Sequence, residues 1–147
     1  MTRWQLTPHD PLTLQLAADA RVSQTDYVDD QIWELVPGSQ GNPALALQTS
    51  YGGRLGLASL VPIWRVDNRP IYEYQAYATP PVIAAFTPGY AQALAKITPT
   101  LALRADFWVM ESHAVGARFT VKNTGKALEL DFDLVGFAAA QGRELKF

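Results

Sequence analysis

Only a few residues of this chain have the types and spacing that enzymatic or metal chemistry requires. The two histidines are His9, in the turn 8–11 between two prolines, and His113, which directly follows Glu111 and Ser112. Around His113 there is neither the Gly-x-Ser-x-Gly pattern of serine hydrolases nor the His-Glu-x-x-His pattern of zinc peptidases. With two histidines and no cysteine, three-histidine and thiolate sites are excluded. The leading prediction is a chain without catalytic residues, metal or cofactor.

A run of acidic residues between positions 26 and 34 suggests a second kind of chemistry. Glycosidases use two carboxylates roughly 5–10 Å apart, and acidic residues beside aromatic ones such as Trp33 suit a sugar substrate. The spacing does not match the twelve-residue calcium loop of an EF-hand. Clustered aspartates are also common in solvated loops, which is the simpler interpretation. The alternative is a polar ligand site composed of Asp29, Asp30, Glu34 and His113.

The aromatic residues are more informative, because the chain has four Trp, six Tyr and six Phe. Exposed Trp and Tyr on a sheet can stack on the apolar faces of sugar rings. Trp108 shares one strand face with Arg104 and Asp106, the polar side of the run 101–109, which favours an exposed indole. The other interpretation is that the aromatic residues fill a core or an inter-domain contact. The candidate carbohydrate-binding residues are Trp108, Trp33, Trp64, Tyr72 and Tyr74.

The composition is that of a folded globular protein, with 48% hydrophobic and 18% charged residues in a chain of 147. That length suits one domain, over residues 1–147. The net charge is -2, and no basic cluster appears along the sequence, which argues against a nucleic-acid partner. The N-terminal residues lack a signal-peptide pattern, and no apolar run reaches the roughly 18 residues of a membrane span. We expect a cytoplasmic protein, or a piece of a longer one.

Apolar and polar residues alternate with a period of two along most of the chain, which predicts strands. The clearest runs are 115–122 and 127–134, separated by a turn-like segment in which Gly125 suits a positive φ. We expect these two runs to form a hairpin, because one register satisfies both of their faces. In that register residue 122 pairs with 127, Arg118 lies opposite Asp131, and Phe119 lies opposite Leu130.

Shorter strand-like runs recur every ~8–12 residues between turn-forming residues, a spacing typical of sandwiches and barrels. The segment 90–97 contains three alanines and suits either a short helix or a further strand. The sequence predicts an all-β fold, an antiparallel β-sandwich of short strands with hairpin and meander connections. The remaining predicted strands are 12–16, 31–36, 44–48, 57–64, 71–75, 82–86, 101–109 and 141–147.

Four segments resemble the N-terminal β-sandwich of large bacterial glycoside-hydrolase-like proteins. They are Asp29–Leu35, Pro43–Gly52, Phe107–Val115 and Phe119–Gly125. Glycogen-debranching, glucoamylase-like and phosphorylase-like enzymes share the plan, an N-terminal supersandwich followed by an (α/α)₆ barrel. In that family the catalytic carboxylates lie in the barrel. The resemblance therefore implies a domain of a longer protein that packs on a catalytic domain, and it assigns no catalytic residue here.

The leading interpretation is a non-catalytic β-sandwich module of a carbohydrate-active protein that packs on a catalytic domain and contacts glycan. One alternative is a self-contained small-ligand binder or enzyme that uses the loop 26–34 or His113 beside a pocket. Another is an assembly domain that joins a copy of itself through apolar sheet surface. The expected partners are carbohydrate, another domain of the same polypeptide or a second copy, with no nucleic acid and no membrane.

Overall fold

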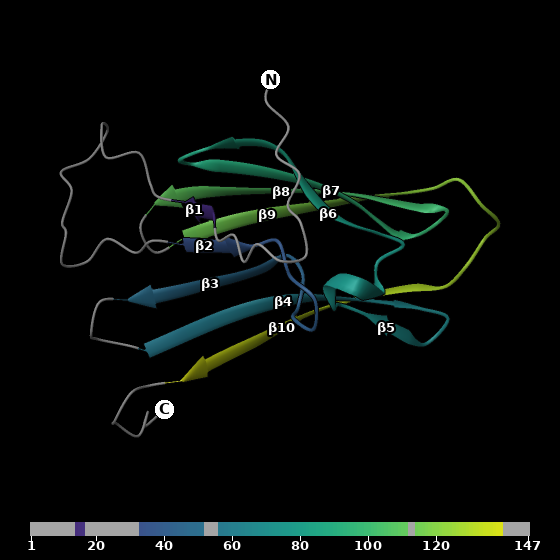
Figure 1. Ribbon diagram of the computed structural model, residues 1–147, viewed down its shortest axis with the longest axis horizontal. Coiled ribbons are helices and arrows are strands. Elements are labelled where there is room, and N and C mark those ends of the chain that lie inside the picture. The colour runs from purple at the N-terminus through teal and green to yellow at the C-terminus, as the bar shows by residue number, and fades with distance from the viewer. Residues whose placement is uncertain (1–13, 17–32, 52–55, 112–113, 140–147) are drawn as a thin grey trace.

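The computed structural model describes residues 14–16, 33–51, 56–111 and 114–139. These residues form two antiparallel β-sheets that pack against each other around an apolar core (Figure 1). The predicted all-β antiparallel sandwich is therefore confirmed. No helix in the described ranges has the length and apolar character that crossing a membrane requires.

The first sheet has the strand order β1–β2–β3–β4–β10, and the short β5 pairs with the end of β4. Its strands are β1 (Leu14–Leu16), β2 (Trp33–Val36), β3 (Ala46–Tyr51), β4 (Gly56–Val66), β5 (Arg69–Ile71) and β10 (Leu130–Ala139). The second sheet is a meander in the order β6–β7–β8–β9. Its strands are β6 (Thr79–Thr87), β7 (Tyr90–Thr98), β8 (Leu101–Glu111) and β9 (Ala114–Asn123). The 3₁₀ helix η1 (Tyr74–Ala76) lies between β5 and β6.

The alanine-containing segment 90–97 forms strand β7, in the interior of the β6–β9 sheet. Ala91, Ala93, Ala95 and Ile97 are buried, while the residues between them are exposed or half-buried. A strand places all four apolar side chains on the core face, whereas a helix would distribute them around its axis. Pairing with β6 and β8 also satisfies the backbone on both sides. Tertiary context therefore outweighs the helix propensity of alanine.

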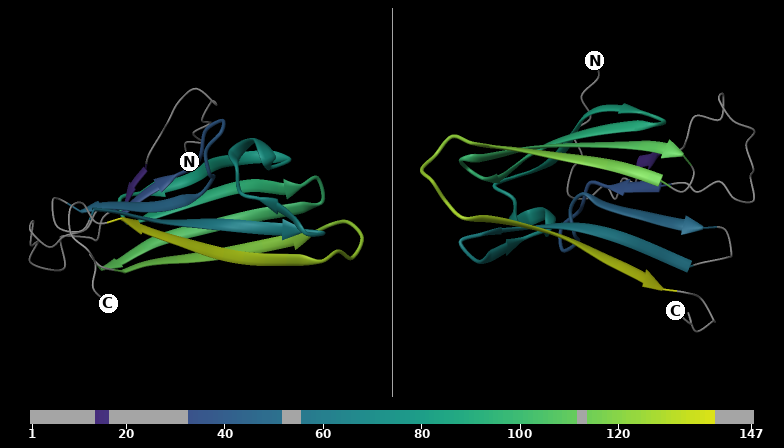
Figure 2. Two further views of the ribbon diagram at one scale, coloured as in Figure 1. Left: turned by 90° about the horizontal axis from the view of Figure 1, so that it is seen from below. Right: turned by 180° about the vertical axis from the view of Figure 1, so that it is seen from behind.

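The predicted hairpin between 115–122 and 127–134 is wrong. Strand β9 pairs with β8, so that Arg118 lies opposite Asp106, and β10 pairs with β4, so that Asp131 lies opposite Arg65. The segment 124–129 carries the chain from one sheet to the other (Figure 2). The apolar faces of β9 and β10 meet across the core, where the rings of Phe119 and Phe132 are 5.2 Å apart. Two strands with alternating apolar and polar residues can pair in one sheet as a hairpin or face each other across the core. The alternation alone therefore cannot distinguish these two arrangements.

Gly125 also has a different role from the one predicted. It is not among the glycines with a positive φ, which in the described residues are Gly38 and Gly41. A Cβ at Gly125 would lie 2.9 Å from the Cβ of Thr100, in the β7–β8 turn. The backbone N–H of Thr124 donates to the carbonyl of Thr100 at 2.9 Å. A glycine at position 125 therefore permits this close approach between the crossing segment and the β7–β8 turn.

The predicted strand 71–75 is largely wrong, because β5 ends at Ile71 and η1 follows. The loop before β3 provides the hydrogen-bond partners of this segment. The N–H of Ala44 donates to the carbonyl of Tyr72 at 2.7 Å, and the N–H of Tyr74 donates to the carbonyl of Asn42 at 3.0 Å. The other predicted strands correspond to described strands with shifted ends. Residues 12–13, 31–32 and 141–147 lie outside the described residues.

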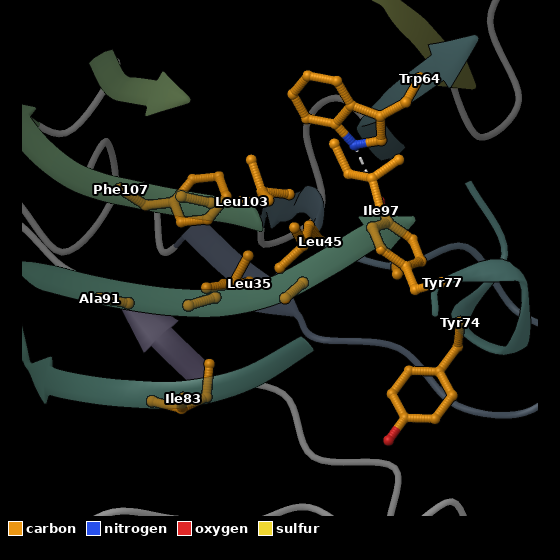
Figure 3. Packing of buried hydrophobic residues seen from close by; sticks show 14 of the residues in the cluster. Leu35, Leu45, Trp64, Tyr74, Tyr77, Ile83, Ala91, Ile97, Leu103 and Phe107 are labelled. Atoms are coloured by element: carbon orange, nitrogen blue, oxygen red, sulfur yellow. Dashed lines mark hydrogen bonds between the residues drawn. The ribbon is translucent and has the colours of Figure 1, made fainter. Parts of the chain in front are cut away.

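The core lies between the two sheets and combines aromatic and aliphatic side chains with the small alanines of β7 (Figure 3). Trp64 of β4 is buried there and makes an edge-to-face contact with Phe119, with ring centroids 5.5 Å apart. Its Nε1 donates a hydrogen bond to the hydroxyl of Tyr77 at 3.0 Å. Burial raises the pKa of Tyr77 to about 12, although the hydrogen bond from Trp64 opposes this rise. The Tyr77 hydroxyl is therefore neutral at ordinary pH.

Candidate functional site

The aromatic residues selected from the sequence are dispersed through the fold. Trp64 is a core residue, and its burial leaves no face for a sugar ring. Trp33 on β2 is half-buried and packs against the core. Tyr74 is buried in η1, and Tyr72 is half-buried just before it. Of the five aromatic candidates, only Trp108 lies on the outer face of a sheet beside a polar cluster.

The alternative polar site falls mainly outside the described residues, where Asp29, Asp30 and His113 lie. Its remaining member, Glu34 on β2, is half-buried and accepts a hydrogen bond from Nε2 of Gln48 at 3.1 Å. Within the described ranges, no three His, Cys, Asp or Glu side chains are grouped as a metal ion would require.

Trp108 is positioned by the register of the β6–β9 sheet. Tyr90 of β7 and Gly116 of β9 are its neighbours on either side. A Cβ at Gly116 would come within 2.6 Å of Nε1 and Cζ2 of the indole. The Trp108 ring therefore lies directly over Gly116, where any other residue would displace it. Cross-strand packing of an aromatic ring on glycine holds the half-buried indole against the sheet.

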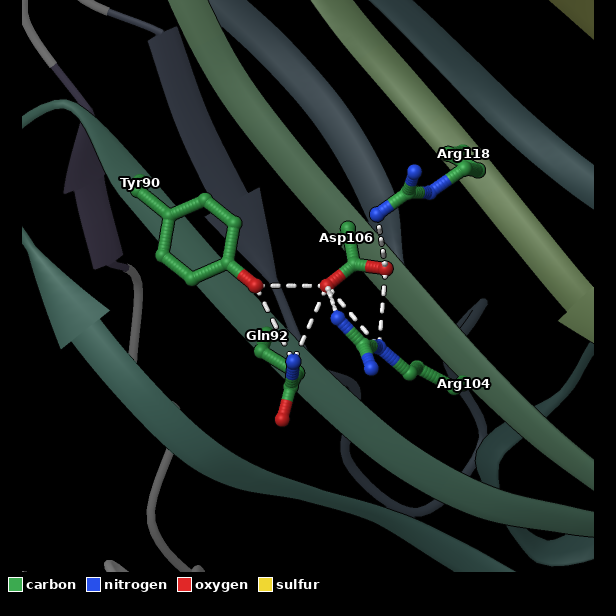
Figure 4. A network of polar contacts seen from close by, with 5 residues as sticks. All are labelled: Tyr90, Gln92, Arg104, Asp106 and Arg118. Carbon is green, nitrogen blue, oxygen red and sulfur yellow. Dashed lines mark hydrogen bonds and ion pairs between the residues drawn. The ribbon is translucent and has the colours of Figure 1, made fainter. Parts of the chain in front are cut away.

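The next row across the same face contains Gln92, Asp106 and Arg118. Asp106 is 1% exposed, although it belongs to the outer face, because its neighbours surround it (Figure 4). Its Oδ1 accepts hydrogen bonds from the Tyr90 hydroxyl at 2.5 Å and from Nε2 of Gln92 at 3.0 Å. A buried carboxylate requires such partners, since the desolvation of an unpaired charge is costly.

Two arginines complete the shell around this carboxylate. Nε of Arg104 lies 2.9 Å from Oδ2 and Nη2 of Arg104 lies 3.0 Å from Oδ1, which makes a two-pronged contact. Nη2 of Arg118 lies 3.5 Å from Oδ2 on the other side. Burial raises the pKa of Asp106, but hydrogen bonds from Arg104, Tyr90 and Gln92 outweigh it and lower the pKa to about 2. The hydrogen bond to Asp106 in turn raises the pKa of Arg104.

We call this set of residues on three adjacent strands the β7–β9 platform. Asp106 organises it from beneath, while the arginine side chains remain 48% (Arg104) and 66% (Arg118) exposed. Each guanidinium carries five N–H donors, of which the contacts to Asp106 use only some. The platform thus presents a held indole beside hydrogen-bond donors that face outward. It consists of Tyr90, Gln92, Arg104, Asp106, Trp108 and Arg118.

The sequence identified part of this platform, because residues two apart on a strand share a face, which places Trp108 beside Asp106 and Arg104. It missed Tyr90 and Gln92, because the segment 90–97 was equally compatible with a helix. It also missed Arg118, which the predicted hairpin assigned to Asp131. Treating 90–98 and 101–109 as a hairpin about the two-residue turn at 99–100 would have placed Tyr90 opposite Val109. A bulge between Lys96 and Thr98 shifts the register by one residue, so that Tyr90 lies opposite Trp108.

A separate open cleft of about 580 Å³ lies between the β4–β5 turn and the β7–β8 turn. Its lining combines apolar residues with the polar residues Asp67, Arg69 and Thr98, and it includes none of the residues selected from the sequence. Asp67 and Asn68 both have positive φ, as in a type I′ hairpin turn. Turn geometry therefore explains this backbone without invoking a ligand.

Comparison with protein-family models, with curated proteins and with solved structures finds no match to this chain.

Proposed function

We propose that this chain is a non-catalytic, glycan-binding β-sandwich module that works beside a catalytic domain, with the β7–β9 platform as its glycan contact. The observation that carries the proposal is the Trp108 indole, held over Gly116 next to the outward-facing donors of Arg104 and Arg118. A sugar ring has an apolar face that stacks on an aromatic ring and hydroxyls that accept hydrogen bonds. The resemblance to the sandwich domains of glycoside-hydrolase-like proteins points to the same ligand class.

The chemistry of the platform suits binding rather than hydrolysis. Glycoside hydrolysis requires two carboxyl groups, one of them able to hold a proton near neutral pH. Asp106 is the single carboxylate of the platform, and its pKa of about 2 keeps it ionised. Its oxygens are occupied by Tyr90, Gln92 and the two arginines. Asp106 therefore acts as a structural anion that fixes its neighbours.

The test is native affinity electrophoresis of the purified chain in gels that contain one soluble polysaccharide each. The panel has two neutral members, dextran and xylan, and two acidic members, polygalacturonate and dextran sulfate. We expect at least one polysaccharide to retard the wild type, and Trp108→Ala to weaken that retardation at least tenfold. Tenfold corresponds to about 1.4 kcal/mol, which is within the range for burial of part of an indole.

Tyr72→Ala is the matched control, because it removes a half-buried aromatic ring elsewhere in the molecule and should leave retardation unchanged. Melting temperatures of both variants establish that they are folded. If no polysaccharide retards the wild type, or if Trp108→Ala is retarded like the wild type, the proposed function is wrong.

A second candidate function, self-association, is favoured by strand β10. It is an edge strand of its sheet, and Phe132, Leu134 and Val135 are 44%, 53% and 47% exposed. An exposed apolar edge strand is a template for pairing with another strand. If two copies of β10 pair antiparallel about Leu134, Asp133 lies opposite Val135 and no two aspartates face each other. We propose a second copy of this chain as the occupant of this edge.

A further inference from the structure

The outer face of the β6–β9 sheet collects cations that are far apart in the sequence. Lys96 and Lys122 lie on either side of Ala102, in a row beyond the platform. Both lysines are exposed, as are Arg104 and Arg118. Four cations thus share the face that β7, β8 and β9 present, although the whole chain has a net charge of -2.

The carboxylate of Asp106 cancels only a small part of the positive charge that this face presents to solvent. In the rows from Tyr90–Trp108–Gly116 to Lys96–Ala102–Lys122, the one carboxylate is Asp106, which is buried beneath its partners. It neutralises about one of the four cations and exposes almost no surface to repel an incoming anion. The face that reaches solvent is therefore cationic, and its aromatic contact lies at one end.

From this juxtaposition we infer that the ligand of the platform is an anionic glycan, a polysaccharide with carboxylate groups along its chain. The inference rests on the proposed function. The guanidinium groups of Arg104 and Arg118 match the planar geometry of a carboxylate. Successive residues on one face of a strand are about 6.8 Å apart, so the rows from Trp108 to Lys122 span ~20 Å. A chain that lies along the strands can stack a sugar on Trp108 and place carboxylates over the cations.

The charge of the rest of the molecule favours a glycan over a nucleic acid. A nucleic-acid binder derives its affinity mainly from phosphate neutralisation over a broad basic surface. Here the cations occupy one face of an acidic protein, and beyond that face a long polyphosphate would meet excess negative charge. A sugar acid needs fewer charge contacts, because its ring and hydroxyls also bind.

The experiment compares matched polysaccharide pairs by affinity electrophoresis of the whole chain. Polygalacturonate is compared with its fully methyl-esterified form, which lacks the charge, and dextran sulfate is compared with dextran. We expect polygalacturonate to retard the wild type at least tenfold more strongly than its methyl ester, with the difference decreasing as salt screens the charges. The dextran pair distinguishes sulfate from carboxylate recognition, and polyuridylate tests the nucleic-acid alternative.

The diagnostic variant is Lys96→Gln/Lys122→Gln, which removes two exposed cations without touching the platform. We expect about three- to tenfold weaker retardation by polygalacturonate, as is usual for two exposed charge contacts. Arg65→Gln/Arg69→Gln, on β4 and β5 of the other sheet, changes the net charge equally and should leave retardation close to that of the wild type. Melting temperatures establish that both variants are folded.

Equal retardation by polygalacturonate and its methyl ester would overturn the inference while leaving glycan binding intact. Stronger retardation by dextran sulfate or by polyuridylate than by polygalacturonate would also overturn it. The same holds if the two double variants weaken binding equally. Absence of retardation by every polysaccharide would remove the proposed function itself, so the two failures are distinguishable.

Discussion

The balance of charge around Asp106 determines what the platform can do. Its pKa of about 2 arises because donated hydrogen bonds and the Arg104 charge outweigh the effect of burial. Asp106 is almost completely shielded from solvent, and its negative charge holds Arg104 and Arg118 in fixed positions. Side chains held in this way lose less conformational freedom when they bind a ligand. The residue that contributes least to the exposed surface thus determines the geometry of the platform.

Asp106→Asn should lower the free energy of unfolding at pH 7 by about 2 kcal/mol, the value that a pKa lowered from 3.8 to about 2 implies. A carboxyl group whose pKa is lower in the folded than in the unfolded state stabilises the fold at pH values above its unfolded pKa. This stabilisation is lost as the pH falls through its folded pKa. The difference in free energy of unfolding between wild type and variant should therefore disappear between about pH 4 and pH 2. Urea denaturation across this range measures it.

The control for this prediction is Asp133→Asn, which breaks an exposed pair with Arg65. Such pairs contribute little, so this variant should differ from the wild type by no more than about 1 kcal/mol. If the gap between wild type and Asp106→Asn stays constant from pH 4 to pH 2, Asp106 is not the group that the network stabilises.

At the scale of elements, the loop 37–45 leads into β3 and makes backbone hydrogen bonds to η1 and to the residues just before it. Leu45 is buried with a φ of 58°, an unusual value for leucine, and its N–H donates to the carbonyl of Pro37 at 3.2 Å. Gly38 has a φ of 119°, and a Cβ there would lie 2.9 Å from Cδ2 of Tyr74 and 3.0 Å from Cα of Ala44. The loop thus combines a left-handed backbone with close packing.

Gly38→Ala should destabilise the protein by about 2 kcal/mol or more, because an unfavourable φ adds to contacts that the backbone of Ala44 cannot relieve. Gly41→Ala is the matched control, since Gly41 also has a positive φ, of 81°, but nothing lies within 4 Å of its added Cβ. It should cost about 1 kcal/mol, the strain of the backbone alone. If urea denaturation shows that both variants lose the same free energy of unfolding, the close packing around Gly38 contributes nothing to stability.

At the scale of the whole molecule, the edges of the two sheets differ. Strand β9 is an edge strand that carries the exposed cations Arg118 and Lys122, and charges of this kind discourage strand pairing. Strand β10 is an edge strand with exposed apolar side chains on both of its faces. The β7–β9 platform and the apolar edge therefore belong to different sheets, so strand pairing through β10 does not use the strands of the platform.

Leu134→Lys should keep the protein monomeric at concentrations where the wild type forms dimers, because in the register about Leu134 the lysines of the two copies would lie directly opposite each other. Light scattering coupled to gel filtration over a hundredfold range of concentration measures this. Thr87→Lys, on the exposed end of the edge strand β6, is the control and should dimerise like the wild type. A wild type that stays monomeric throughout this range would rule out the second copy as the partner of β10.

Much of the fold was predictable because strand formation depends on a local pattern. The alternation in 101–109 placed Trp108, Arg104 and Asp106 on one face before any partner strand was known. The pairing of β9 and β10 was not predictable in the same way, since the apolar face of β9 fits a neighbour in its own sheet or one across the core. The predicted pairing of Phe119 with Leu130 and the observed contact of Phe119 with Phe132 both place apolar side chains together, so the alternation is compatible with either.

The sequence by itself determined that this chain folds as an antiparallel β-sandwich, because side chains on a strand alternate between its two faces. Only the tertiary structure decided which strands are neighbours, and the candidate site depends on that choice. Arg104, Arg118, Lys96 and Lys122 are spread over 27 positions, and the sequence shows no cluster among them. Hydrogen bonding between β7, β8 and β9 brings them onto one face, because strand pairing joins residues that are distant along the chain.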